Sequence, residues 1–234
     1  MKVLFRNLLV SIKQNTKASK VVWAVFLACV TAFMGLGLVD PILPIIAQQL
    51  GASKIEVSML FTAYSAVMAV TMLVTATISK RVGIKRTLLV GVSIIAIFSI
   101  LCGLSNDIWS IIFLRGFWGL GNALFIAVAL TAIILFSDKT THESVILYEI
   151  AIGLGFSVGP LVGGLLGDIS WKFPFFGVGI LMMMGFIMLL VLIPKSTTKE
   201  IESYDDDTSL VTTIKSLKNP HIKVFGTFSF LYNF

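Results

Sequence analysis

The chain has 234 residues, of which 57% are hydrophobic and 13% are charged, and its formal net charge at pH 7 is +6. The charged share is about half that of a typical soluble domain, which excludes a water-soluble globular protein and indicates one that crosses the membrane several times. Cys29 and Cys102 both lie within apolar runs and lack the spacing of a disulfide framework or a metal site.

Six apolar runs are long enough to provide the roughly 20 residues that a transmembrane helix needs. They cover residues 21–48, 56–79, 87–105, 108–136, 145–167 and 172–193. A basic leader, residues 1–20, precedes the first run, which is too long for a cleaved signal peptide. The sequence therefore predicts an all-α membrane protein with a six-helix bundle over residues 21–193.

The carboxyl-terminal part of the sequence changes character. Residues 194–220 are polar and contain three consecutive aspartates, which predicts a cytoplasmic linker. The apolar segment that follows has roughly 13 residues, too few to cross a bilayer. We interpret residues 221–234 as the truncated start of a seventh transmembrane helix, in either a fragment or the product of a truncated gene.

The positive charges predict the orientation. Of the 18 Lys and Arg residues, all but Lys54, Lys172 and Arg115 fall in the leader or in alternate loops. Because cytoplasmic loops of membrane proteins are enriched in Lys and Arg, we expect the amino terminus in the cytoplasm and the chain in the cell membrane. The net positive charge is thereby assigned to topology, and no nucleic-acid partner is expected.

Asp40 is the only acidic residue in the first 55 positions, and it lies inside the first run. A buried carboxylate is costly in a membrane, so it usually faces a cavity or a partner. Pro41 and Pro44 should loosen the helix just beyond it. We expect Asp40 to handle protons or cations; the alternative is an acid near the outer interface that water reaches.

The loop between the second and third runs contains Gly83, Lys85 and Arg86. Gly83 permits a tight turn, and the cations can cap helix ends or pair with acids on a neighbouring helix. Glu149, about one turn inside the fifth run, is the expected pairing partner of this loop around Lys80 and Arg86, although it could instead titrate. We expect Gly83, Lys85, Arg86 and Glu149 to contribute to gating; the alternative is a basic loop that only sets the orientation in the membrane.

Arg115 is the one basic residue within the fourth run. Its burial in an apolar span would be costly unless it meets a partner, the alternative being that it extends toward the outer face. From the ends of their runs, Asp40 lies roughly 16 Å and Arg115 roughly 12 Å deep, at 1.5 Å per residue. We therefore expect these two charges to face the same central cavity and to act in proton and substrate coupling.

Small residues recur at every fourth position of the fifth run, at Ala151, Gly155, Gly159, Gly163 and Gly167. On a helix this spacing forms one stripe without side chains, which lets a second helix approach closely. Pro160 lies within the same run and favours a kink. The stripe predicts tight helix packing that can still rock.

Four strings resemble motifs of the major facilitator superfamily, and of its drug:proton antiporters in particular. They are GLGLVDPILP (35–44) in the first helix, ISKRVGIKRTLL (78–89) in the loop, LRGFWGLGNALF (114–125) in the fourth helix, and a fifth-helix antiporter signature over Gly155, Gly159, Pro160, Gly163 and Gly164. The sequence departs from the family pattern where Lys80 replaces an acid, Ala76 a glycine, and Trp118 a common glutamine.

The resemblance implies the fold of the amino-terminal half of a twelve-span transporter, built as a 3+3 inverted repeat. It also implies proton-coupled efflux of lipophilic or cationic drugs by alternating access, with no cofactor beyond the proton gradient. The expected partners are a small-molecule substrate, protons, the lipid bilayer, and either a missing carboxyl-terminal six-helix half or a second copy.

Three alternatives remain. The chain could be a symporter or facilitator for sugars, organic acids or amino acids, or a truncated membrane subunit that does not transport. An intramembrane enzyme is disfavoured, because His142 and His221 are in loops without ligand spacing, and no metal site is expected.

Overall fold

The computed structural model shows a bundle of α-helices and describes residues 2–138 and 140–193, without the side chains of residues 2–19 and of Asp40. The elements are α1 (Lys2–Val39), a 3₁₀ turn η1 (Asp40–Ile42), α2 (Leu43–Leu50), α3 (Lys54–Val82), α4 (Ile84–Leu104), α5 (Ile108–Phe136), α6 (Thr141–Ile169) and α7 (Phe173–Leu192). The predicted linker, residues 194–220, and the predicted seventh helix, residues 221–234, lie outside the described residues.

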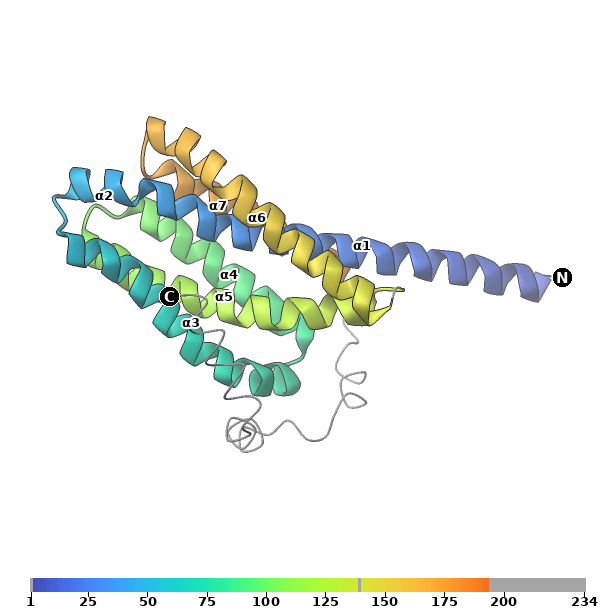
Figure 1. The fold of residues 1–234 in the computed structure, drawn as a ribbon. Helices are drawn as coiled ribbons and strands as arrows, with labels where there is room; N and C mark the ends of the chain where they lie inside the picture. The colour runs from blue at the N-terminus through green and yellow to red at the C-terminus, as the bar shows by residue number, and fades with distance from the viewer. Residues whose placement is uncertain (1, 139, 194–234) are drawn as a thin grey trace.

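Six helices in the described part of the chain are long and apolar enough to cross a membrane, which confirms the all-α prediction. They are the part of α1 from Lys20, together with α3, α4, α5, α6 and α7. Helix α1 is one helix from Lys2 to Val39, so it includes residues 2–20 of the predicted leader. Its amino-terminal part extends beyond the bundle (Figure 1).

The first apolar run is broken at its acidic residue, Asp40. Helix α1 ends at Val39, the 3₁₀ turn η1 begins at Asp40, and α2 starts at Leu43. Pro41 and Pro44 explain the break, because proline lacks an N–H donor and its ring crowds the preceding turn. The predicted span of residues 21–48 is therefore two helices joined at Asp40.

The second and fifth spans, α3 and α6, begin in the same way. Ser53 caps α3 and Thr140 caps α6, each accepting a hydrogen bond from the backbone N–H of a glutamate three residues later. The carboxylates of Glu56 and Glu143 in turn accept hydrogen bonds from the backbone N–H groups of the two capping residues, at 2.8 and 3.0 Å. These reciprocal capping boxes, on two helices of 29 residues each, mark α3 and α6 as equivalent elements.

The helix contacts show the same equivalence. The most extensive pairs are α3 with α5 and α1 with α6, followed by α4 with α5, α4 with α7, and α1 with α7. If α1 corresponds to α5, α3 to α6 and α4 to α7, then the α3–α5 pair corresponds to the α6–α1 pair. In the same way, the α4–α5 pair corresponds to the α7–α1 pair. This is the packing of two three-helix repeats, as in transporters with inverted repeats.

Helices α1 and α5 form the centre of the bundle. In the most apolar stretch of each helix, 72% of the residues of α1 and 61% of those of α5 are buried, against 11% for α3 and 22% for α6. Figure 1 shows α3 and α6 on opposite sides, with α1, α4 and α5 between them. The centre therefore consists of α1, which ends just before Asp40, and α5, which carries Arg115, and the flanks keep large exposed apolar faces.

Candidate functional site

The glycine stripe of α6 faces α1 along its whole length. A methyl group built on Gly155 would come within 2.8 Å of main-chain atoms of α1, and one built on Gly159 within 2.8 Å of the Met34 carbonyl oxygen. On Gly163 it would collide with the carbonyl oxygen of Leu38. The two backbones are in direct contact, so the stripe predicted from the sequence is the packing surface. We call this contact the α1–α6 seam.

The antiporter signature divides into two groups. Gly155, Gly159 and Gly163 are buried in the α1–α6 seam, whereas a methyl group on Gly164 would meet nothing within 4 Å. Pro160 lies against the seam, because a methyl group built on Gly37 of α1 would come within 3.0 Å of the proline ring. Helix α6 continues through Pro160 to Ile169.

The seam continues past the break in α1. Gly163 packs against Leu38, and a methyl group on Gly167 would collide with the side chain of Ile42. These two contacts lie on either side of Asp40, which begins η1. The backbone of α6 thus supports the interrupted stretch of the first span from both ends.

Arg115 lies inside the bundle with only 3% of its surface exposed. The carbon atom of its guanidinium group is 5.4 Å from the centre of the Tyr64 ring and 5.7 Å from that of Trp118. Both distances fall within the range of cation–π attraction, which is stronger where water is excluded. The alternative that Arg115 extends to the outer surface is therefore wrong.

Tyr64 and Asn122 add a polar contact that the sequence analysis missed. The amide Nδ2 of Asn122 donates a hydrogen bond of 2.6 Å to the hydroxyl of Tyr64, and both residues are buried. The signal was present, because Asn122 is seven residues after Arg115 and therefore on the same face of α5. We call Tyr64, Arg115, Trp118 and Asn122 the polar cluster.

Among the uncharged side chains of this cluster, two buried polar atoms make no hydrogen bond within the described residues. They are Nε1 of Trp118 and Oδ1 of Asn122. An unsatisfied buried polar group costs free energy, and more so in a membrane. The cluster therefore offers one further donor and one further acceptor beside the guanidinium of Arg115.

The packing relates the depth of the two predicted charges. The Trp118 ring lies 3.3 Å from the position of a methyl group on Gly35, so these two residues are level. Helices α1 and α5 run in opposite directions (Figure 1). Measured along the helices at 1.5 Å per residue, Asp40 then lies about 7 Å beyond Gly35 and Arg115 lies about 4 Å beyond Trp118, both in the same direction. The backbone at Asp40 is thus at nearly the depth of Arg115; the Asp40 side chain lies outside the described residues.

In the basic loop, Gly83 links α3 to α4 with a φ of 93°, a conformation that side chains disfavour. Lys85 donates hydrogen bonds to the carbonyl oxygens of Leu190, at 2.9 Å, and of Ile193. Its charge therefore lies at the carboxyl end of α7, where a cation is favoured by the exposed carbonyl groups. Lys85 ties the loop to the end of the sixth span.

The expected partner of this loop, Glu149, lies on the exposed side of α6, and Arg86 is also exposed. The pairing of Glu149 with the loop around Lys80 and Arg86 stays a prediction.

No group of three or more His, Cys, Asp or Glu side chains that could hold a metal ion occurs among the described residues. His142 is exposed at the start of α6, and His221 lies outside the described residues.

Comparison with known proteins gives a consistent result. The family model described as Major Facilitator Superfamily matches residues 25–234. The multidrug efflux protein YfmO of Bacillus subtilis is 48% identical over 92% of this chain and 53% of its own length. The quinolone resistance protein NorA of Staphylococcus aureus is 24% identical over 77% of this chain and 47% of its own length. The chain thus spans about half the length of the curated relatives it matches.

Proposed function

This chain belongs to the Major Facilitator Superfamily, and we propose that it forms half of an exporter of lipophilic, often cationic small molecules. The observation that carries the proposal is its similarity to a multidrug efflux protein along nearly the whole chain. A second six-helix half, or a second copy of this chain, would complete the path for the substrate. The distribution of Lys and Arg supports a cell-membrane location with the amino terminus in the cytoplasm.

Alternating access is supported by how unevenly the helices pack. The α1–α6 seam brings the two backbones into direct contact at Gly155, Gly159 and Gly163, so these helices would move together. The outward faces of α3 and α6 are the least buried surfaces of the spans and would meet the other half. Rocking of the two halves would then open the centre, where α1 and α5 lie, to each side of the membrane in turn.

Coupling to protons is proposed for Asp40 and Arg115. Ionisable residues inside a span commonly mark ion or proton pathways. A proton arriving at Asp40 would change the net charge of the central cavity that Asp40 and Arg115 are expected to share. A cationic substrate entering that cavity would change its net charge in the same direction. Proton and substrate could therefore compete for one site, as antiport requires, and the proton gradient would be the only energy source.

Loss of a fluorescent lipophilic cation from preloaded cells tests both parts of this proposal. In the complete transporter, Asp40→Asn should abolish export while membrane insertion is unchanged, because the amide cannot exchange a proton. Asp168→Asn is a matched control, since Asp168 is exposed near the end of α6, and should export normally. A protonophore should stop export by the unaltered protein.

The outcomes separate the two claims. Normal export by the Asp40→Asn variant would remove Asp40 from the mechanism but leave the exporter. Export that persists with the protonophore would contradict proton coupling. If the unaltered transporter exports none of a panel of lipophilic cations but accumulates a sugar, organic acid or amino acid, the symporter alternative replaces efflux.

The half-length match favours one further test. Expressed alone, this chain should export dye only if two copies assemble. A non-transporting subunit would show no export whatever the proton gradient across the membrane. Co-expression with a complementary six-helix half should then restore export. Failure of both arrangements would support a membrane protein that inserts but does not transport.

A further inference from the structure

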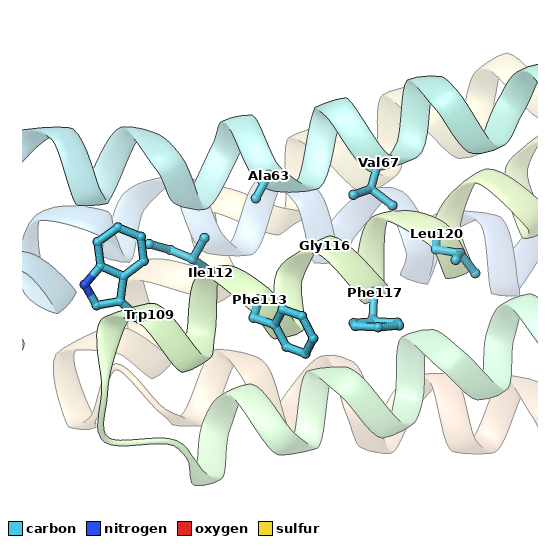
Figure 2. A pocket seen from close by; sticks show the side chains of 8 residues that line it. All are labelled: Ala63, Val67, Trp109, Ile112, Phe113, Gly116, Phe117 and Leu120. Atoms are coloured by element: carbon cyan, nitrogen blue, oxygen red, sulfur yellow. The ribbon is translucent and has the colours of Figure 1, made fainter.

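Helix α5 borders an apolar hollow of about 480 Å³ on a face away from the polar cluster. It is lined by Ala63, Val67, Trp109, Ile112, Phe113, Gly116, Phe117 and Leu120. Figure 2 shows Trp109 at one end and Leu120 at the other, with α3 along one side. The six lining residues from α5 recur at intervals of three and four, so they share one face of that helix.

The walls of the hollow are fixed by packing. On the α4 side, Phe117 stacks on Phe98 with ring centres 4.8 Å apart and planes 8° apart. Gly116 leaves the floor open, because a methyl group there would only touch Val67 at 3.5 Å. The result is a groove lined by α3 and α5, with Phe98 of α4 packed against Phe117 at its edge.

The groove is open toward its surroundings along its length. Trp109, Phe113 and Phe117 expose 55%, 67% and 37% of their surfaces. Apart from the indole nitrogen of Trp109 at its end, the lining side chains contain only carbon and hydrogen. An occupant must therefore be apolar and linear, and it must come from within the membrane.

The dimensions match one leaflet. From Trp109 to Leu120 the floor extends about 16 Å, at 1.5 Å per residue, and one leaflet contributes roughly 15 Å of the hydrocarbon core. Helix α5 begins at Ile108, so Trp109 lies at the end of the span, where tryptophan is favoured at the membrane–water interface. A chain entering at Trp109 would reach Leu120 near the middle of the bilayer.

We propose that this groove binds one acyl chain of a phospholipid from the leaflet on the Trp109 side. The polar groups at its mouth suit a zwitterionic headgroup. The first turn of α3 carries Lys54 and Glu56, and the Glu56 carboxylate interacts with the Trp109 indole and with the charge of Asp107. Lys54 offers a cation for the phosphate, and the two carboxylates offer anions for the amine.

Quenching of tryptophan fluorescence by a brominated lipid tests this site. Trp23 and Trp109 are matched reporters, because they are 54% and 55% exposed and only Trp109 lies at the groove. A Trp23→Phe variant reports on Trp109, a Trp109→Phe variant reports on Trp23, and Trp118 and Trp171 are a common buried background. Phosphatidylcholine with brominated chains is titrated into each full-length variant in mild detergent.

The Trp109 signal should saturate near one lipid per chain, with half-maximal quenching at about tenfold less lipid than the Trp23 signal, equivalent to about 1.4 kcal/mol. Gly116→Leu in the Trp23→Phe background should fill the groove and remove the saturable part. Gly153→Leu is the matched control, since a methyl group on Gly153 of α6 would meet nothing within 4 Å, and should leave it unchanged.

Superimposable titrations for Trp109 and Trp23 would overturn the proposal, even if Gly116→Leu fails to fold. Unchanged quenching in a folded Gly116→Leu variant would overturn it as well. If the Trp109 signal does not saturate and the chain elutes as a dimer that Gly116→Leu dissociates, a second copy rather than a lipid occupies the groove. None of these outcomes depends on transport activity.

Discussion

The two largest helix contacts are related by the repeat, yet they have different chemistry. In the α1–α6 seam, the backbone of α6 meets the backbone of α1 through Gly155, Gly159 and Gly163. In the α3–α5 contact, one glycine does the same, because a methyl group on Gly119 would collide with the Tyr64 carbonyl oxygen. Around that glycine lies the polar cluster, whose charge and hydrogen bond have no counterpart among the seam glycines.

The difference shows that one packing geometry can serve two purposes. A glycine stripe brings helices close without any polar side chain, so van der Waals packing is the main attraction between them. The α3–α5 contact instead uses close approach to bury a guanidinium between two aromatic rings. Substitutions that enlarge glycine should therefore weaken the seam by overpacking, and substitutions that remove polar atoms should affect only the cluster.

The largest expected effect is on the α1–α6 seam. Gly163→Ala should lower the free energy of unfolding by about 1–3 kcal/mol, because its new methyl group collides with the backbone of α1 and not with a flexible side chain. Titration with a denaturing detergent, followed by circular dichroism, measures this change. Gly164→Ala is the neighbouring control with open space around it, and it should be neutral or stabilising by up to about 1 kcal/mol. Equal effects at the two positions would contradict backbone contact in the seam.

A smaller effect is expected in the polar cluster. Tyr64→Phe keeps the ring beside Arg115 but removes the acceptor of the 2.6 Å hydrogen bond from Asn122. It should cost about 0.6–2 kcal/mol, the range for hydrogen bonds between membrane helices. The same detergent titration applies. Tyr148→Phe is the control, since its hydroxyl makes only a long contact of 3.5 Å to the Ile126 carbonyl oxygen and should cost less. If Tyr148→Phe were equally destabilising, the hydrogen bond of the polar cluster would add no more stability than the hydroxyl of an ordinary buried tyrosine.

The smallest effect tests a contact outside both of these helix pairs. Lys85→Met should destabilise the bundle by about 0.3–1 kcal/mol, because the carboxyl end of α7 loses its cation. Hydrogen exchange at the end of α7 should increase in this variant. Arg86→Met removes the adjacent exposed charge and should leave that exchange unchanged; if it has the same effect, net charge of the loop and not the Lys85 contact stabilises α7.

Much of the fold could be predicted because membrane insertion is governed by local properties. Each span is an apolar run of sufficient length, and each helix satisfies its own backbone, so the six spans follow from composition. The break at Asp40 was foreshadowed by Pro41 and Pro44 for an equally local reason. The glycine stripe predicted that α6 would pack closely against another helix, but not which helix that would be.

For the site residues, the sequence did not predict which residues of other helices they contact. Arg115 was expected to need a partner, yet nothing in its own helix indicated Tyr64, which is 51 positions earlier on α3. The spacing along α6 places Gly163 on the stripe and Gly164 beside it, but only the position of α1 shows that the stripe is in contact and that Gly164 faces open space. Charge alone predicts that Glu149 pairs with the basic loop, and the structure places it on the exposed side of α6.

The sequence by itself determined the class of the protein, its six spans and the existence of a small-residue stripe, because these depend on runs and spacings along one chain. Only the tertiary structure decided which helix meets the stripe, which rings enclose Arg115, how Asn122 finds Tyr64, and where an apolar groove remains. Those outcomes depend on the mutual orientation of helices distant in the sequence, and that orientation results from the packing of all six spans together.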